Sequence, residues 1–123
     1  MLTNPNIYIS TGAARETTAA SWGQALLGVH KFPLELSGGK FSDRVHHELR
    51  ELSASTPIML HNYFPPPKDP FVLNLASTDP DITRRSRDLV IAALDLSVEF
   101  GASHYAVHSG YCLDATVDSL GRP

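Results

Sequence analysis

The sequence predicts an α/β fold with a parallel sheet, because short apolar runs alternate with amphipathic helical segments along the chain. Such runs are typical of strands buried in parallel sheets. Two of them end in a histidine, His61 or His108, and pass directly into a loop rich in polar residues, glycine or proline. The predicted strands are Ile7–Thr11, Phe32–Ser37, Pro57–His61 and Ser103–His108. Right-handed crossovers should connect them.

The first predicted helix runs from about Thr18 or Ser21 to His30. Its buried stripe is expected to consist of three residues spaced i, i+4 and i+7: Trp22, Leu26 and Val29. The second helix should begin near Ser42 or Asp43, since either residue is a good N-cap. Its buried side is predicted from the same periodicity: Val45, Leu49 and Leu52.

The third helix is predicted to begin at Asp79-Pro80, an N-cap followed by proline at the first helical position, and to end near Phe100. Gly101 is a natural residue to follow it. Four residues form its apolar stripe: Leu89, Ala93, Leu96 and Phe100. Three more are expected to widen the stripe against the sheet: Val90, Leu94 and Val98.

The stretch from Asn62 to about Thr78 is predicted to be irregular, and it is too aromatic and apolar for a solvated linker. We expect it to fold over the end of the sheet. After the fourth strand, residues 109–123 are expected to form a loop with one weak helical turn near Ala115 to Leu120.

Composition and charge exclude several classes of protein. The 123 residues suffice for one domain, and the net charge of −3, with no basic run longer than Arg84-Arg85, gives no basic stripe for duplex nucleic acid. No apolar segment is long enough to span a bilayer. The N-terminus, Met1 to Asn6, lacks signal-peptide features, and the single Cys112 fits a reducing compartment, so we expect a cytoplasmic protein.

Four short segments together resemble the xylose-isomerase-like TIM-barrel superfamily, which includes sugar phosphate isomerases and epimerases and endonuclease IV: Ile7–Thr11, Leu34–Gly39, Leu60–Pro67 and Val107–Tyr111. The resemblance runs from about Ile7 to Tyr111. The family's (β/α)8 barrel typically needs ~250 residues. The resemblance therefore implies that residues 1–123 form one partial domain, the N-terminal half of such a barrel, with about four strands and three helices and the second half absent.

The same resemblance implies roles for the two strand-end histidines. In the endonuclease-IV-like pattern, His61 and His108 would be ligands of a divalent metal ion, with Zn, Mn, Mg and Co all open. In the sugar isomerases of the superfamily the second half binds the metal, and the two histidines would instead contact substrate. Both readings stay open, as does a structural role within the barrel.

Five further residues are candidate contacts for a sugar substrate: Glu35, Asn62, Tyr63, Asn74 and Ser109. Glu35 could orient a histidine, hold a sugar hydroxyl or make a structural ion pair. The loop residues Asn62, Tyr63 and Asn74 could bind a polyol or cap the backbone of their own loop.

We therefore expect a metal-dependent sugar or sugar-phosphate isomerase or epimerase, incomplete in this chain because the general base would come from the second half. Two alternatives remain, an endonuclease-IV-like phosphodiesterase and a non-catalytic barrel fragment. The open edges of a half barrel also predict self-association.

Overall fold

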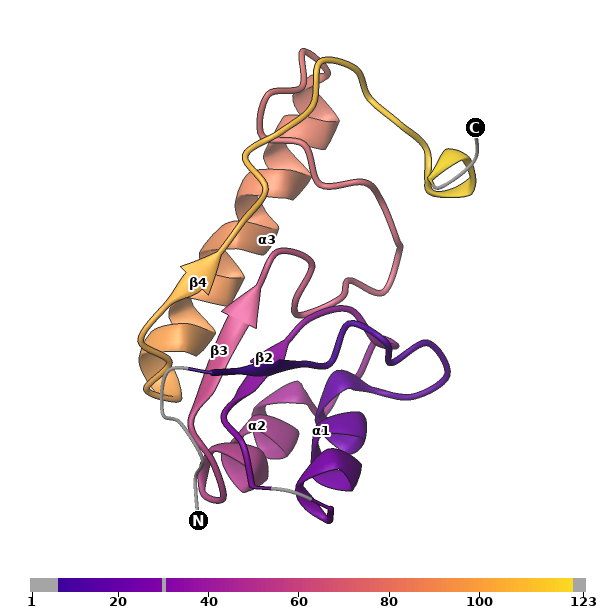
Figure 1. Ribbon diagram of the computed structural model, residues 1–123. Helices are drawn as coiled ribbons and strands as arrows, with labels where there is room; N and C mark the ends of the chain where they lie inside the picture. The colour runs from indigo at the N-terminus through magenta and orange to yellow at the C-terminus, as the bar shows by residue number, and fades with distance from the viewer. Residues whose placement is uncertain (1–6, 30, 121–123) are drawn as a thin grey trace.

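The computed structural model describes residues 7–29 and 31–120, which form a parallel sheet of four strands in the order β1-β2-β3-β4 (Figure 1). The predicted α/β class and alternation are confirmed. The strands are β1 (Ile9–Ser10), β2 (Leu34–Leu36), β3 (Ile58–His61) and β4 (Tyr105–Ala106). The helices are α1 (Ala19–Leu27), α2 (Val45–Ser53) and α3 (Pro80–Glu99), and a short 3-10 helix, η1, spans Val117–Ser119.

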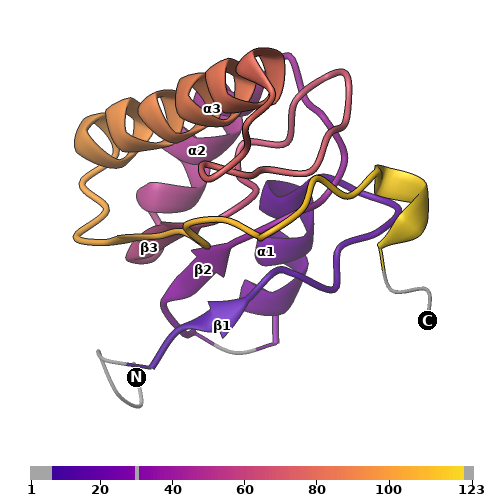
Figure 2. The same cartoon turned by 90° about the horizontal axis from the view of Figure 1, so that it is seen from above.

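All three helices lie on one side of the sheet (Figure 2). Each strand pairs in parallel with the next strand along the chain, and a helical connection joins each pair. The strands are buried on the helix side, where residues from β2 and β3 meet residues from the helices in one apolar core: Leu34, Leu36, Ile58, Leu60, Ala19, Ala20, Leu49, Leu52 and Leu96. The opposite face of the sheet has no helix on it within the described part of the chain.

Helix α1 differs from its predicted form. Thr18 is its N-cap, and the helix buries Ala19, Ala20 and Gly23. Of the predicted stripe, Leu26 packs against the core, whereas Trp22 is 38 % exposed and Val29 is 74 % exposed, so the prediction was wrong for those two residues. The physical reason is close packing, since a Cβ atom at Gly23 would lie only 2.9 Å from Leu34 Cδ1. The predicted helix end, His30, lies outside the described residues.

Helix α2 begins later than predicted, with Arg44 at the N-cap position and no side-chain cap. Ser42 lies before the helix, where its hydroxyl accepts a hydrogen bond from the Arg44 amide and donates one to the Glu48 carboxylate. Leu49 and Leu52 are fully buried, which confirms the predicted inner side of this helix.

Helix α3 begins and ends as predicted. The Asp79 side chain accepts hydrogen bonds from the first turn, and Gly101 follows the helix with a φ of 67°. The helix buries Leu89, Ala93 and Leu96. The prediction that Leu94 and Val98 widen its inner stripe is wrong, because these residues are 46 % and 85 % exposed.

The loop after β3 lies at the end of the sheet to which the strands point (Figure 1). Its Phe64, Leu73 and Asn74 are buried, which explains why it is not a solvated linker. None of the helices in the described ranges combines the length and apolar content that a membrane crossing requires. The N-terminal segment used above to argue against a signal peptide, residues 1–6, lies outside the described residues, as do residues 121–123.

Candidate functional site

The two strand-end histidines lie beside each other. The ring centroids of His61 and His108 are 5.5 Å apart, with the rings inclined edge to face at 65°. His61 is the last residue of β3, and His108 follows β4 by two residues. Because β3 and β4 are neighbouring parallel strands, their C-terminal ends meet at one edge of the sheet. The two histidines thus lie close enough together to contact one metal ion or one substrate, as the resemblance implied.

Glu35 joins this pair from the middle of β2. Its Oε1 atom lies 3.3 Å from His61 Nδ1, and the side chains of Glu35 and His61 are 23 % and 27 % exposed. Glu35 alternates with the buried Leu34 and Leu36, which places its side chain on the helix-free face of the sheet. A carboxylate at this distance favours a proton on Nδ1 of His61. The other ring nitrogen, Nε2, then keeps its lone pair and can bind a metal ion.

Asn62 holds the ends of β3 and β4 together. Its backbone amide donates to the carbonyl of Ala106, and its backbone carbonyl accepts a hydrogen bond of 2.8 Å from the Tyr105 hydroxyl. Its side-chain Oδ1 accepts from the backbone amide of His108 at 3.1 Å. The residue has a φ of 40°, in the left-handed region that asparagine tolerates better than most residues. This predicted substrate contact therefore fixes the backbone at His108 to the end of β3.

Two tyrosines near the histidines remain neutral phenols. Burial raises the pKa of Tyr105 to about 12. Burial also raises the pKa of Tyr63, although the hydrogen bond of 2.8 Å that its oxygen accepts from the Phe71 amide lowers it. Tyr63 was predicted as a substrate contact, whereas Tyr105 was missed. Its position in a strand gave no sign that its hydroxyl would reach back to Asn62.

Asn74 is 1 % exposed and has hydrogen-bond partners on both ends of its amide. Its Nδ2 donates to Asp114 Oδ1 at 2.7 Å, and its Oδ1 accepts from the amides of Ala76 and Tyr111. These contacts tie the loop after β3 to the chain after β4. Of the two readings left open by the sequence, backbone capping is the one this geometry supports. Ser109 is exposed and lines a hollow with Gly110, Tyr111 and Cys112.

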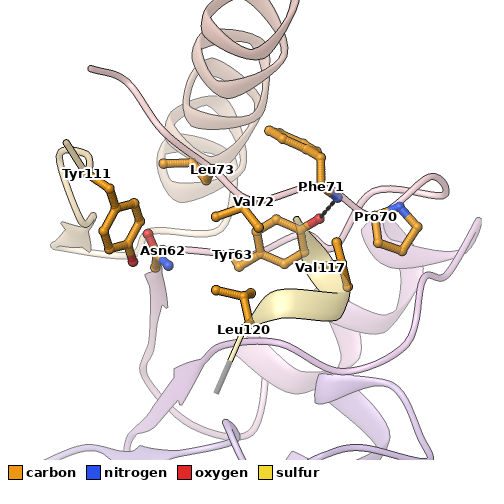
Figure 3. A pocket seen from close by; sticks show the side chains of 9 residues that line it. All are labelled: Asn62, Tyr63, Pro70, Phe71, Val72, Leu73, Tyr111, Val117 and Leu120. Atoms are coloured by element: carbon orange, nitrogen blue, oxygen red, sulfur yellow. Dashed lines mark hydrogen bonds between the residues drawn. The ribbon is translucent and has the colours of Figure 1, made fainter. Parts of the chain in front are cut away.

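An apolar pocket of about 290 Å³ lies between the loop after β3 and the segment that follows β4 (Figure 3). The Tyr63 ring occupies the middle of the lining, between Val72 and Leu120, while Asn62 and Tyr111 lie together at one end. Sequence reasoning missed Tyr111, Val117 and Leu120, because their contact with the loop arises only in the folded chain. The only available signal was the predicted turn at 115–120.

The donors near His61 are few. Within residues 7–29 and 31–120, no group of three or more His, Cys, Asp or Glu side chains is arranged to hold a metal ion. Glu35, His61 and His108 therefore offer at most two imidazole ligands and one supporting carboxylate. Two protein ligands are fewer than a closed zinc site uses, and they leave positions for water or substrate oxygen.

Comparison with known proteins yields no relative. No family model, no curated protein and no solved structure matches the chain. The resemblance to the xylose-isomerase-like superfamily thus stays a prediction.

Proposed function

We propose that the chain carries part of a divalent-metal site that acts on a sugar or sugar phosphate as an isomerase or epimerase. The observation that carries this proposal is the placement of His61, His108 and Glu35 together at the C-terminal edge of a parallel sheet. Chemistry in β/α folds is concentrated at this edge.

The sheet belongs, in this proposal, to the first half of a (β/α)8 barrel. Consecutive parallel pairing with all helices on one side is the arrangement that such a half requires. The helix-free face, with Glu35 and His61, would then line the barrel interior. A second copy of the chain is the partner we expect on the open edges of β1 and β4, and light scattering would then give twice the mass of one chain.

Each residue has a distinct part in the proposed site. His61 and His108 would hold the metal through imidazole nitrogen, and Glu35 would fix the ring of His61 through Nδ1. A bound divalent cation would polarise a sugar carbonyl and its neighbouring hydroxyl. Asn62 keeps the two histidines in register through its contacts with β4.

Titration with Co²⁺, followed by visible absorbance, tests the metal site. We expect His61→Ala and His108→Ala each to weaken Co²⁺ binding about tenfold or more. The matched control is His47→Ala, since His47 also lies near a carboxylate, with Nε2 3.5 Å from Glu51 Oε1, but on the exposed side of α2. Equal affinity in all three variants, or no difference from the unaltered chain, would exclude the site.

The reaction is tested with aldose, ketose and epimer pairs, free and phosphorylated, whose interconversion is followed by NMR. Because the general base is expected from the second half of the barrel, we expect little or no turnover by this chain alone, and any turnover that it shows should be abolished by chelator and restored by added metal. Turnover that persists in chelator, or in the His61→Ala and His108→Ala variants, would contradict a metal-dependent isomerase built on these residues.

A further inference from the structure

We propose that the pocket around Tyr63 binds an uncharged aromatic ring, so that the substrate of the neighbouring histidine site is a sugar bearing an aryl group rather than a sugar phosphate. The part about the substrate rests on the proposed function, whereas binding of a ring in the pocket is tested without metal.

The lining is the first evidence. None of the nine residues around the pocket carries a formal charge, and most are aromatic or aliphatic. Small-molecule sites have this composition, with few polar groups to set orientation. Here those groups belong to Asn62 and to the tyrosines at positions 63 and 111.

The size of the pocket matches one ring. An apolar cavity of about 150 Å³ suffices for benzene, and this pocket has about 290 Å³. It would hold a phenyl group and leave room for the linking atom. Tyr63 and Tyr111 offer ring faces and edges for the offset or edge-to-face contacts that aromatic groups prefer.

Incomplete burial is the second, independent evidence. Tyr111, Val117 and Leu120 line the pocket, yet they are 46 %, 47 % and 56 % exposed. Apolar side chains gathered around one hollow and left half-exposed are a mark of a binding surface. An aromatic ligand would cover all three at once.

Phosphate does not suit this pocket. A phosphate group would need a cation or several donors to replace its hydration, and no lysine, arginine or histidine among the described residues lines the space. The Arg85 guanidinium is not part of the lining: it lies 4.3 Å from the centroid of the Phe71 ring and donates to the carbonyl of Asp69.

The position of the pocket links it to the histidines. Asn62 lines one end of it, directly follows His61 in the chain, and accepts a hydrogen bond from the amide of His108. A ligand with its ring in the pocket would therefore extend its polar end past Asn62 toward the histidine pair.

The test is calorimetric titration of the full chain with phenyl β-D-glucopyranoside, methyl β-D-glucopyranoside and glucose 6-phosphate, together with phenol in the presence of EDTA. We expect the phenyl glycoside to bind about tenfold or more tightly than the methyl glycoside and the phosphate. Equal binding of the two glycosides, or tightest binding of the phosphate, would overturn the proposal.

Variants locate the binding. We expect Val117→Asp and Leu120→Asp to lose phenol and phenyl glycoside binding at least tenfold, and Leu113→Asp to leave it unchanged. Leu113 is the matched control, since it belongs to the same segment, is 69 % exposed and does not line the pocket. Equal loss in the control would refute the assignment.

The two proposals fail in different ways. A chain that binds Co²⁺ through His61 and His108 but does not bind phenol refutes the pocket alone. A chain that binds phenol in EDTA but no metal supports the pocket and refutes the metal site.

Discussion

On the helix-covered face of the sheet, Leu34, Leu36 and Leu60 are at most 1 % exposed, whereas Glu35 and His61 on the opposite face keep about a quarter of their side-chain surface exposed. These residues alternate along the same two strands. The apolar set contacts the helices and excludes water, while the polar set faces away from them and is held by contacts with its neighbours. One strand therefore serves stability with every second residue and candidate chemistry with the others.

The difference in packing between the two faces of the sheet is tested most directly by truncating adjacent residues of β3. We expect Leu60→Ala to lower the free energy of unfolding by about 2–5 kcal/mol, because it leaves a cavity in a fully packed site. Met59→Ala, on the helix-free face, should cost less than about 1.5 kcal/mol, since Met59 is already partly exposed. Urea denaturation followed by circular dichroism measures both. Equal losses would show that both faces are packed alike.

The next effect concerns Asn62. Asn62→Ala should cost about 1–2 kcal/mol, since alanine is less stable than asparagine in the left-handed region and loses the bond to the His108 amide. Asn62→Gly removes the same hydrogen bond, but glycine adopts a positive φ without strain. This variant should therefore lose clearly less free energy of unfolding than Asn62→Ala. Denaturation gives the stabilities, and the amide NMR shift of His108 reports the lost bond in both variants. An alanine variant as stable as the glycine variant would contradict the backbone argument.

A smaller effect on stability is expected at Glu35. Glu35→Gln should change the free energy of unfolding by less than about 1 kcal/mol, because the contact with His61 is partly exposed to solvent. It should nevertheless weaken Co²⁺ binding about tenfold, since the carboxylate orients the ligand imidazole. Glu51→Gln, beside His47 on α2, is the control and should leave Co²⁺ binding unchanged. Loss of stability without loss of metal binding would assign Glu35 a purely structural role.

The last effect, confined to alkaline pH, is a pH dependence at Tyr105. Its pKa is raised from the ordinary 10.0 to about 12, so between these values the unfolded chain releases a proton that the folded chain keeps. The folded state binds more protons there, and stability must fall as pH rises through this interval. The Tyr105→Phe variant should show a shallower decline. Thermal unfolding at several alkaline pH values measures the slopes, and identical slopes would place the phenol in a solvent-like setting.

The elements that local chemistry specifies were predictable from the sequence. Helix α3 has Asp79 as its N-cap, begins at Pro80 and is followed by Gly101 as expected, because an N-cap, a proline and a glycine act within one turn. The inner side of α2 followed from simple periodicity. By contrast, α1 packs through Gly23 and two alanines, and a search for large apolar residues selected its exposed Trp22 instead. Small residues at i and i+4 were the signal for close packing.

The candidate site was predictable only in part. The convergence of His61 and His108 follows from parallel pairing of β3, which His61 ends, with β4, which His108 follows by two residues. The approach of Glu35 to His61 depends on sheet register, which the sequence alone did not determine. The hydrogen bonds of Asn62 with Tyr105 and His108, and the pocket around Tyr63, both depend on contacts between segments more than forty residues apart. Such contacts leave no local periodicity to read.

The consecutive strand order has a consequence for how the chain acquires its structure. Each of β2, β3 and β4 pairs with the strand that precedes it in sequence, so its partner has already been synthesised and lies only one helical connection away along the chain. Loop closure is then limited to one helical connection at a time, which lowers the entropic barrier of each step. A chain of this kind is suited to forming its sheet progressively from the N-terminal side as it leaves the ribosome. The histidine pair would be assembled last, when β4 docks on β3.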